Sequence, residues 1–101
     1  MKMGDTLLWV MYDIQNDKVR NKVAQYCKQA GLYRVQKSVF LGTLNWNDMD
    51  TLNLQIEAII DREHDSVYLF PMCKSDFSKV VLLGQAFHKD LVSDQLKTLF
   101  L

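Results

Sequence analysis

The chain has 101 residues, a length that suits a single domain with its own hydrophobic core. Its 49% hydrophobic and 24% charged residues, with one proline, are typical of a folded chain and argue against disorder. The net charge of zero excludes a uniformly basic protein, and no apolar run approaches the roughly 20 residues of a membrane span. The N-terminus lacks the basic, apolar and small-residue order of a signal peptide, so we expect a cytoplasmic protein without membrane contact.

The charges are distributed unevenly along the chain. Residues 18–37 contain six basic residues and no acidic one, whereas residues 51–101 contain seven acidic and five basic residues. A local basic segment can attract phosphate groups even when the whole chain is neutral, although a solvated basic helix face has the same pattern. The six bases are Lys18, Arg20, Lys22, Lys28, Arg34 and Lys37.

Asp13 follows the first apolar run of the chain. Residues 7–12 are all apolar and precede a polar stretch, which predicts a buried strand. Sheets in α/β proteins commonly bind ligands outside the carboxyl ends of their strands, so Asp13 is a candidate site residue. The alternative is a carboxylate that only caps or solvates the strand end.

A helix is predicted from about residue 17 to residue 30. Asn16 or Asp17 can cap its N-terminus, the apolar residues between have helical spacing, and Gly31 suits the position after its end. Its first turns carry several bases. We therefore expect Asp13, these bases and the free backbone N–H groups of the helix N-terminus to share one corner.

Residues 33–44 alternate in polarity and predict either one long bent strand or two short ones, with the break unplaced. After a turn at residues 45–48, a second helix is predicted to end near Arg62. Its expected buried face consists of Leu52, Ile56, Ile59 and Ile60.

The last elements are shorter. Residues 66–72 predict a strand whose Pro71 belongs near its end or on a sheet edge, because proline cannot donate to a ladder. Residues 80–84 predict a further short apolar strand. In residues 88–101, apolar side chains recur at helix-like intervals, and this tail could dock on a partner or fold back on its own dimer.

Cysteines and histidines give no zinc-binding spacing. We expect Cys27, on the apolar face of the first helix, and Cys73, at a strand end, to be reduced packing residues. His64 and His88 have no evident partner in the sequence and are expected on the surface.

The order of elements predicts an α+β fold, a ferredoxin-like β-α-β-β-α-β sandwich with two helices on one face of a mostly antiparallel sheet. Residues 1–84 would form this domain, including the extra strand, and residues 85–101 an interaction tail. The extra strand is expected to pair with an open sheet edge, in this chain or a second one. This fold hosts many functions and assigns none.

Several motifs resemble the Cas-two family, small CRISPR-associated proteins of the spacer-acquisition machinery. The resemblance covers about residues 7–84, and the stretch Arg34–Gly42 (Arg-Val-Gln-Lys-Ser-Val-Phe-Leu-Gly) is its most specific part. The other motifs are Tyr12-Asp13-Ile14, Asp17-Lys18-Val19-Arg20, Gly31-Leu32 and Asp65-Ser66-Val67-Tyr68.

The resemblance implies a homodimer in which the post-core strand of one chain joins the sheet of the other. It implies that Asp13 matches a metal-associated aspartate close to its symmetry mate. It also implies a metal-dependent endonuclease acting on single-stranded RNA or double-stranded DNA, and a platform that holds DNA for the CRISPR integrase. A role without nuclease chemistry occurs in some members.

Four residues fall at positions where the family carries functionally important side chains: Arg20, Lys22, Arg34 and Phe40. Arginine is common at the position of Lys22, and lysine keeps the charge but loses the bidentate fork. Val19 and Leu41 also replace an arginine and a glutamate common in the family. These departures bear on catalysis more than on the fold.

One carboxylate per chain is too little to hold Mg²⁺, but a two-fold axis beside Asp13 would supply two. Two close carboxylates repel, and a divalent ion (Mg²⁺, or another such as Mn²⁺) removes that penalty. It could then activate a water for attack on a phosphodiester, with Arg20 or Arg34 steadying the developing charge. The nucleic-acid contacts predicted together are Tyr12, Lys18, Arg20, Lys22, Arg34, Lys37, Ser38 and Phe40.

Some of these contacts have structural alternatives. Tyr12 and Phe40 could stack on a base or contact sugar, but strand aromatics more often belong to the core. Ser38 could orient a metal-bound water or simply shape a turn. Because water is the nucleophile, this mechanism does not distinguish RNA from DNA.

Three functions therefore remain after the sequence is considered. The first is a metal-dependent endonuclease that works with the CRISPR integrase in spacer acquisition. The second is a non-catalytic DNA-binding adaptor of that integrase, which needs the basic segment but not Asp13. The third is a toxin-type ribonuclease on the same fold.

Overall fold

The computed structural model describes residues 5–84 of the chain. The predicted tail, residues 85–101, and His88 within it therefore lie outside the described residues. Seven elements are present in order: β1 (Asp5–Asp13), α1 (Asp17–Gln29), β2 (Tyr33–Gln36), β3 (Val39–Asn45), α2 (Trp46–Glu57), β4 (Ser66–Met72) and α3 (Lys74–Phe77). Within this part of the chain, no helix is both long and apolar enough to cross a membrane.

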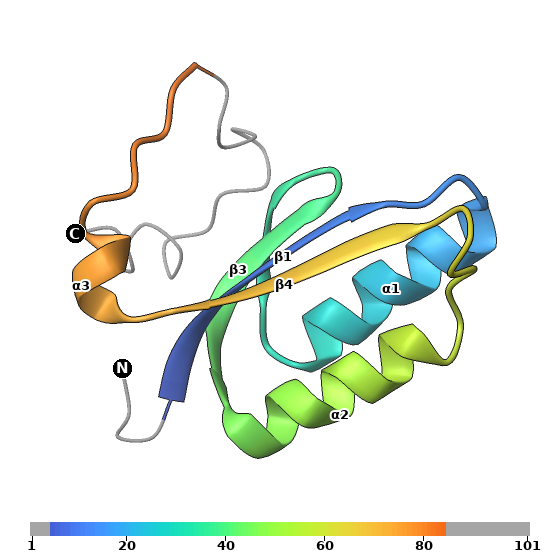
Figure 1. Ribbon diagram of the computed structural model, residues 1–101, viewed down its shortest axis with the longest axis horizontal. Helices are drawn as coiled ribbons and strands as arrows, with labels where there is room; N and C mark the ends of the chain where they lie inside the picture. The colour runs from blue at the N-terminus through green and yellow to red at the C-terminus, as the bar shows by residue number, and fades with distance from the viewer. Residues whose placement is uncertain (1–4, 85–101) are drawn as a thin grey trace.

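The sheet has the strand order β2-β3-β1-β4, and every neighbouring pair is antiparallel. Two β-α-β crossovers produce this order, and both α1 and α2 cover the same face of the sheet (Figure 1). The predicted ferredoxin-like α+β fold is confirmed. Strand β4 lies at a sheet edge, which agrees with the position expected for Pro71.

Alternation along β1 builds both sides of the sheet. Leu8, Val10 and Tyr12 point into the main core beneath the two helices. Leu7 and Trp9 belong to a second cluster on the opposite face, called the helix-free face because neither α1 nor α2 covers it. This cluster also contains Val35, Leu41 and, from the short helix α3, Phe77. The strand is apolar on both sides because each side is covered, and this explains the continuous apolar run in the sequence.

The caps of α1 follow the sequence signals. The side chain of Asn16 accepts a hydrogen bond from the backbone N–H of Val19 at 3.0 Å and caps the helix. Gly31 follows the C-cap with φ of 94°, a left-handed conformation that glycine adopts at little cost. The predicted limits of this helix are confirmed.

Gly42, the last residue of the Arg34–Gly42 motif, lies where there is little space for a side chain. A Cβ atom at this position would lie 2.9 Å from Cδ2 and 3.1 Å from Cα of Leu32. Strand β3 therefore passes close to the chain leaving α1, and glycine allows this approach without a shift of Leu32.

The sequence left open whether residues 33–44 form one bent strand or two short ones, and two strands are present, joined by a tight turn at residues 37–38. The predicted end of the second helix was wrong. Helix α2 ends at Glu57 instead of near Arg62, because the carboxylates of Asp61 and Asp65 accept backbone N–H groups and favour a turn. Ile59 and Ile60 consequently pack against the core from the turn, only partly buried.

The short strand predicted at residues 80–84 is not a strand in the single chain. No edge within residues 5–84 pairs with it, and a strand requires a ladder partner. Val80 packs against the second cluster, whereas Val81 and Leu83 are 75% and 81% exposed. The sequence pattern did not predict α3, which precedes this segment and buries Phe77.

Cys27 is buried as predicted, and burial raises the pKa of its thiol to about 12. Cys73 is exposed, so its prediction as a packing residue was wrong; its Sγ accepts from the N–H of Asp76 at the start of α3. His64 is on the surface as predicted, but it has a partner. Its Nδ1 lies 2.9 Å from Oδ2 of Asp61, and this contact is the main cause that lowers the pKa of the Asp61 carboxyl.

Candidate metal and nucleic-acid site

Asp13 is the last residue of β1 and lies opposite Ser66, the first residue of β4. Strand alternation places its side chain on the same face as those of Trp9 and Met11, which is the face without α1 and α2. The side chain is exposed. A carboxylate is therefore presented to solvent at one corner of the helix-free face.

Arg20 closes the turn that follows Asp13. Its Nη1 donates to the carbonyl oxygens of Ile14 at 3.2 Å and Gln15 at 3.4 Å, and its Nη2 lies 2.5 Å from Oδ1 of Asp17. The guanidinium thus joins the first turn of α1 to the end of β1. Arg20 therefore contacts the backbone of the two residues that follow Asp13, while the expected grouping of Asp13 with the basic side chains stays a prediction.

The lysines of α1 differ from Arg20 in their exposure. Lys18 and Lys22 are both exposed in the first turns of the helix. The ammonium of Lys22 lies 5.2 Å from the ring centroid of Tyr26, a cation–π contact that leaves its donors open to solvent. These two ammonium groups are available to an incoming phosphate.

Arg34 lies on the opposite face of the sheet from Asp13. Its guanidinium carbon is 5.1 Å from the ring centroid of Phe40, a residue of the main core that is fully buried. Its Nε is buried without a hydrogen-bond partner. Within one chain, the fold therefore does not bring Arg34 together with Asp13.

Tyr12 packs in the same cluster. Its ring stacks on Phe40 with a centroid distance of 6.4 Å, and its hydroxyl donates to the carbonyl of Lys37 at 3.4 Å. Burial raises the pKa of the Tyr12 hydroxyl above its ordinary value, and the neighbouring Arg34 opposes part of this rise. Tyr12 and Phe40 thus hold the turn between β2 and β3 against β1.

Lys37 and Ser38 form that turn. The backbone N–H of Tyr12 donates to the carbonyl of Ser38 at 3.1 Å, which fixes the turn beside the end of β1. Lys37 is exposed and Ser38 is partly buried. Of the predicted nucleic-acid contacts, the side chains most open to solvent are therefore those of Lys18, Lys22 and Lys37.

The donor set for a metal ion is small. Among the residues that the structure describes, no group of three His, Cys, Asp or Glu side chains could hold one. Asp17, the nearest acidic residue in sequence, is bound by Arg20. At this corner, residues 5–84 of one chain thus offer Asp13 as the carboxylate without an ion-pair partner, and Mg²⁺ needs further oxygen ligands from a second chain, from water or from a phosphate.

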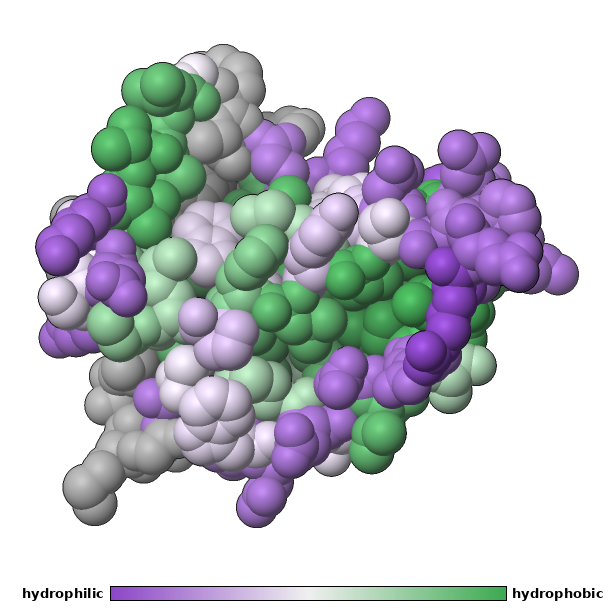
Figure 2. Space-filling view, viewed as in Figure 1, coloured by the Kyte–Doolittle hydropathy of each residue, from purple (hydrophilic) through white to green (hydrophobic). Residues whose placement is uncertain are grey.

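The helix-free face carries aromatic side chains that the sequence pattern did not mark as functional. Tyr68 and Phe70 on β4 are 55% and 46% exposed, and their rings are parallel within 4° with centroids 5.9 Å apart. The alternation of side chains along β4, which places Tyr68 and Phe70 on one face, was the signal in the sequence that could have identified this surface. The apolar segment Val80–Gly84 extends from the same side of the molecule (Figure 2).

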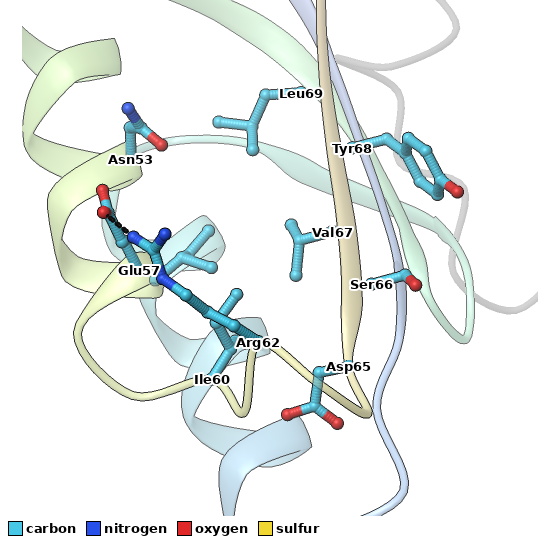
Figure 3. Close-up of a pocket in the computed structure, with 10 residues that line it drawn as sticks. Asn53, Glu57, Ile60, Arg62, Asp65, Ser66, Val67, Tyr68 and Leu69 are labelled. Atoms are coloured by element: carbon cyan, nitrogen blue, oxygen red, sulfur yellow. Dashed lines mark hydrogen bonds and ion pairs between the residues drawn. The ribbon is translucent and has the colours of Figure 1, made fainter.

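A groove of about 410 Å³ lies between α2 and β4, on the side of the sheet that the helices cover (Figure 3). Its floor is apolar, with Ile56, Ile60 and Val67, and an ion pair between Arg62 and Glu57 crosses its rim. None of the predicted site residues lines it. The site at Asp13 is therefore an open corner and not a pocket.

Comparisons with known proteins agree with this geometry. Residues 6–80 match the family described as CRISPR associated protein Cas2. A CRISPR-associated endoribonuclease Cas2 from Desulforudis audaxviator (strain MP104C) is 42% identical over 67 residues, which cover 66% of this chain and 63% of that protein. Another, from Korarchaeum cryptofilum (strain OPF8), is 33% identical over 89 residues, which cover 84% of this chain and 91% of that protein.

The crystal structure of Streptococcus pyogenes Cas2 at pH 6.5 superposes with a TM-score of 0.66 at 28% identity, covering 77% of this chain and 99% of that one. The sheet order and the carboxylate at the end of β1 define a ferredoxin-like α+β protein with an open acidic corner. Within that class, the chain belongs to the Cas2 family, the same family that its sequence motifs resemble.

Proposed function

We propose that this protein is a CRISPR adaptation protein that hydrolyses phosphodiester bonds of single-stranded RNA or double-stranded DNA with a divalent ion, and works with the CRISPR integrase to insert spacers. The observation that carries the proposal is the exposed Asp13 at the end of β1, beside the basic first turns of α1. Family relatives named CRISPR-associated endoribonuclease Cas2 support the nuclease activity.

The active form would be a homodimer joined through the helix-free face. The exposed rings of Tyr68 and Phe70 provide apolar surface there, and Asp13 lies on the same face. A two-fold axis near this corner would bring two copies of Asp13 together. The segment Val80–Gly84 is exposed from Val81 onward and has no partner strand within residues 5–84, and it would add to the free edge of the partner's β4.

The paired Asp13 carboxylates suit Mg²⁺ or Mn²⁺, which bind proteins through one or two carboxylates together with waters and substrate phosphates. When bound, the ion would supply an activated water and stabilise the developing negative charge. The protein's own part is to hold both carboxylates at one point and to position the phosphodiester. Lys18, Lys22 and Lys37 are exposed and suited to positioning its phosphates.

A second function is a non-catalytic adaptor that holds DNA for the integrase. The observation that favours it is the small donor set: no group of three potential ligands is present within residues 5–84, and the Asp17 carboxylate is paired with Arg20. The basic residues would serve either function, and only the nuclease requires Asp13.

The test is the substitution Asp13→Asn, which removes the charge and keeps the size of the side chain. We expect cleavage of RNA and DNA in the presence of a divalent ion to fall at least 100-fold, with an unchanged dimer in sedimentation. Asp50→Asn, an exposed acid on α2, is the matched control and should cleave as the wild type does. Cleavage that survives Asp13→Asn contradicts the nuclease mechanism, and unchanged spacer acquisition by this variant in cells supports the adaptor.

A further inference from the structure

The guanidinium of Arg20 donates its hydrogen bonds to groups of the protein itself, whereas the side chains of Lys18 and Lys22 are exposed to solvent. We propose that Arg20 is a positioning residue, which holds the turn after Asp13 so that this carboxylate is placed for metal binding, and that it does not bind phosphate. The proposal deepens the proposed function and rests on it for the metal site. It assigns phosphate binding at this corner to Lys18 and Lys22.

The geometry of Arg20 carries the proposal. Its three acceptors, the carbonyls of Ile14 and Gln15 and the carboxylate of Asp17, lie within the four residues that follow Asp13. The side chain is only 38% exposed. A guanidinium has five N–H donors in a fixed planar fork, and this fork matches several acceptors arranged around one turn.

These contacts have a structural consequence for Asp13. Ile14 directly follows Asp13, and its carbonyl lies between the end of β1 and the start of α1, outside the ladder whose backbone N–H groups could donate to it. Arg20 supplies the donor and so fixes the backbone that carries Asp13. It also binds Asp17, which keeps the second carboxylate of this corner from competing for a cation.

Phosphate binding by Arg20 would cost free energy, because hydrogen bonds within the protein would be lost. The guanidinium would have to release acceptors that it already satisfies, including a charged one. Lys22, two residues further along α1, has no such commitment, because its ammonium contacts only the face of Tyr26 among the interactions of residues 5–84. Helix α1 therefore carries one residue, Arg20, that stabilises the turn before it, and exposed lysines that can bind phosphate.

Four variants of the full-length chain separate the two roles: Arg20→Gln, Arg20→Lys, Lys22→Gln and the control Arg62→Gln. Arg62 is an exposed arginine that pairs with Glu57 beside the groove between α2 and β4. Three quantities are measured for each variant: hydrogen exchange of the amides of residues 14–17, affinity for Mn²⁺, and the salt dependence of duplex DNA binding.

For Arg20→Gln we expect at least tenfold faster exchange in the turn and at least tenfold weaker Mn²⁺ binding, with an unchanged slope of log affinity against log salt. Arg20→Lys should recover part of both effects, since lysine can reach one acceptor but lacks the fork. Lys22→Gln should lower the salt slope by about one, because one lysine–phosphate interaction is removed, and should leave Mn²⁺ binding unchanged. Arg62→Gln should change none of the three.

The proposal is overturned if Arg20→Gln lowers the salt slope as much as Lys22→Gln does, or if it leaves exchange in the turn unchanged. Failure of the proposed function gives a different result. In that case the wild type itself binds no Mn²⁺, and the exchange and salt measurements still decide whether Arg20 braces the turn or contacts phosphate.

Discussion

Tyr12 and Asp13 are neighbours in sequence but act on opposite sides of the sheet. Tyr12 is buried against Phe40 beneath the helices, whereas Asp13 faces solvent on the other side. Strand alternation imposes this division, so a motif that reads as one unit combines a packing residue with a candidate metal ligand. Arg34, which stacks on Phe40, is a packing residue like Tyr12.

The buried thiol of Cys27 predicts how stability depends on pH. Burial raises its pKa from the ordinary 9.0 to about 12, so the folded state holds this proton after the unfolded state has released it. The stability contributed by the neutral thiol is complete below pH 9 and is lost as the pH rises through 12.

In urea denaturation of the reduced protein, we therefore expect the unfolding free energy to fall between pH 9 and 12, with Cys27 contributing about 1.4 kcal/mol per pH unit. Cys27→Ala should remove this contribution and give a shallower slope. Cys73→Ala, at the exposed cysteine, should keep the wild-type slope. Equal slopes in the wild type and Cys27→Ala would show that the thiol does not carry this effect.

At the residue scale, sequence patterns identified Asp13 and the bases but not the contacts of Arg20. Alternation alone assigns Tyr12 and Asp13 to different faces, so their separation was predictable. The acceptors of Arg20 are largely backbone carbonyls, and no residue pattern records where a carbonyl points. The bracing role therefore required the structure.

At the scale of elements, strong local signals were reliable and weak ones were not. Asn16 and Gly31 mark the ends of α1 through capping chemistry that depends only on neighbouring residues. The turn at residues 37–38 contains Lys-Ser in place of glycine or proline, so the break between β2 and β3 had no clear signal. Helix α3 has four residues, too few to show a period.

The segment Val80–Gly84 illustrates a different limit. Its apolar residues correctly indicate a need for burial, yet no edge within residues 5–84 pairs with them. Strand formation depends on a hydrogen-bonding partner as well as on the segment's own composition. If the partner is a second chain, the single chain shows the exposed segment and the free edge of β4 but not the pairing itself.

The whole molecule has two unequal faces. Helices α1 and α2 cover one side of the sheet (Figure 1). The other side exposes Tyr68 and Phe70, on the same face as Asp13. The sheet order β2-β3-β1-β4 is that of the ferredoxin-like fold, which the order of the elements predicted. The proposed dimer forms through this exposed face. The metal site would therefore depend on the association of two chains.

Phe70→Asp tests this dependence. We expect the variant to fold, because the side chain is 46% exposed, but to sediment as a monomer and to bind Mn²⁺ at least tenfold more weakly. The cause is a charge placed in an apolar interface without a partner. Leu54→Asp on α2, also at an exposed apolar residue, is the matched control and should remain a dimer. A dimeric Phe70→Asp protein would place the interface elsewhere.

The central claim is that two copies of Asp13 form one shared metal site. The most direct measurement is the stoichiometry of Mn²⁺ binding by titration calorimetry of the purified dimer. We predict one ion per two chains for the wild type and none at the same concentration for Asp13→Asn, with the dimer intact in both. One ion per chain, or unchanged binding after Asp13→Asn, would contradict the shared site.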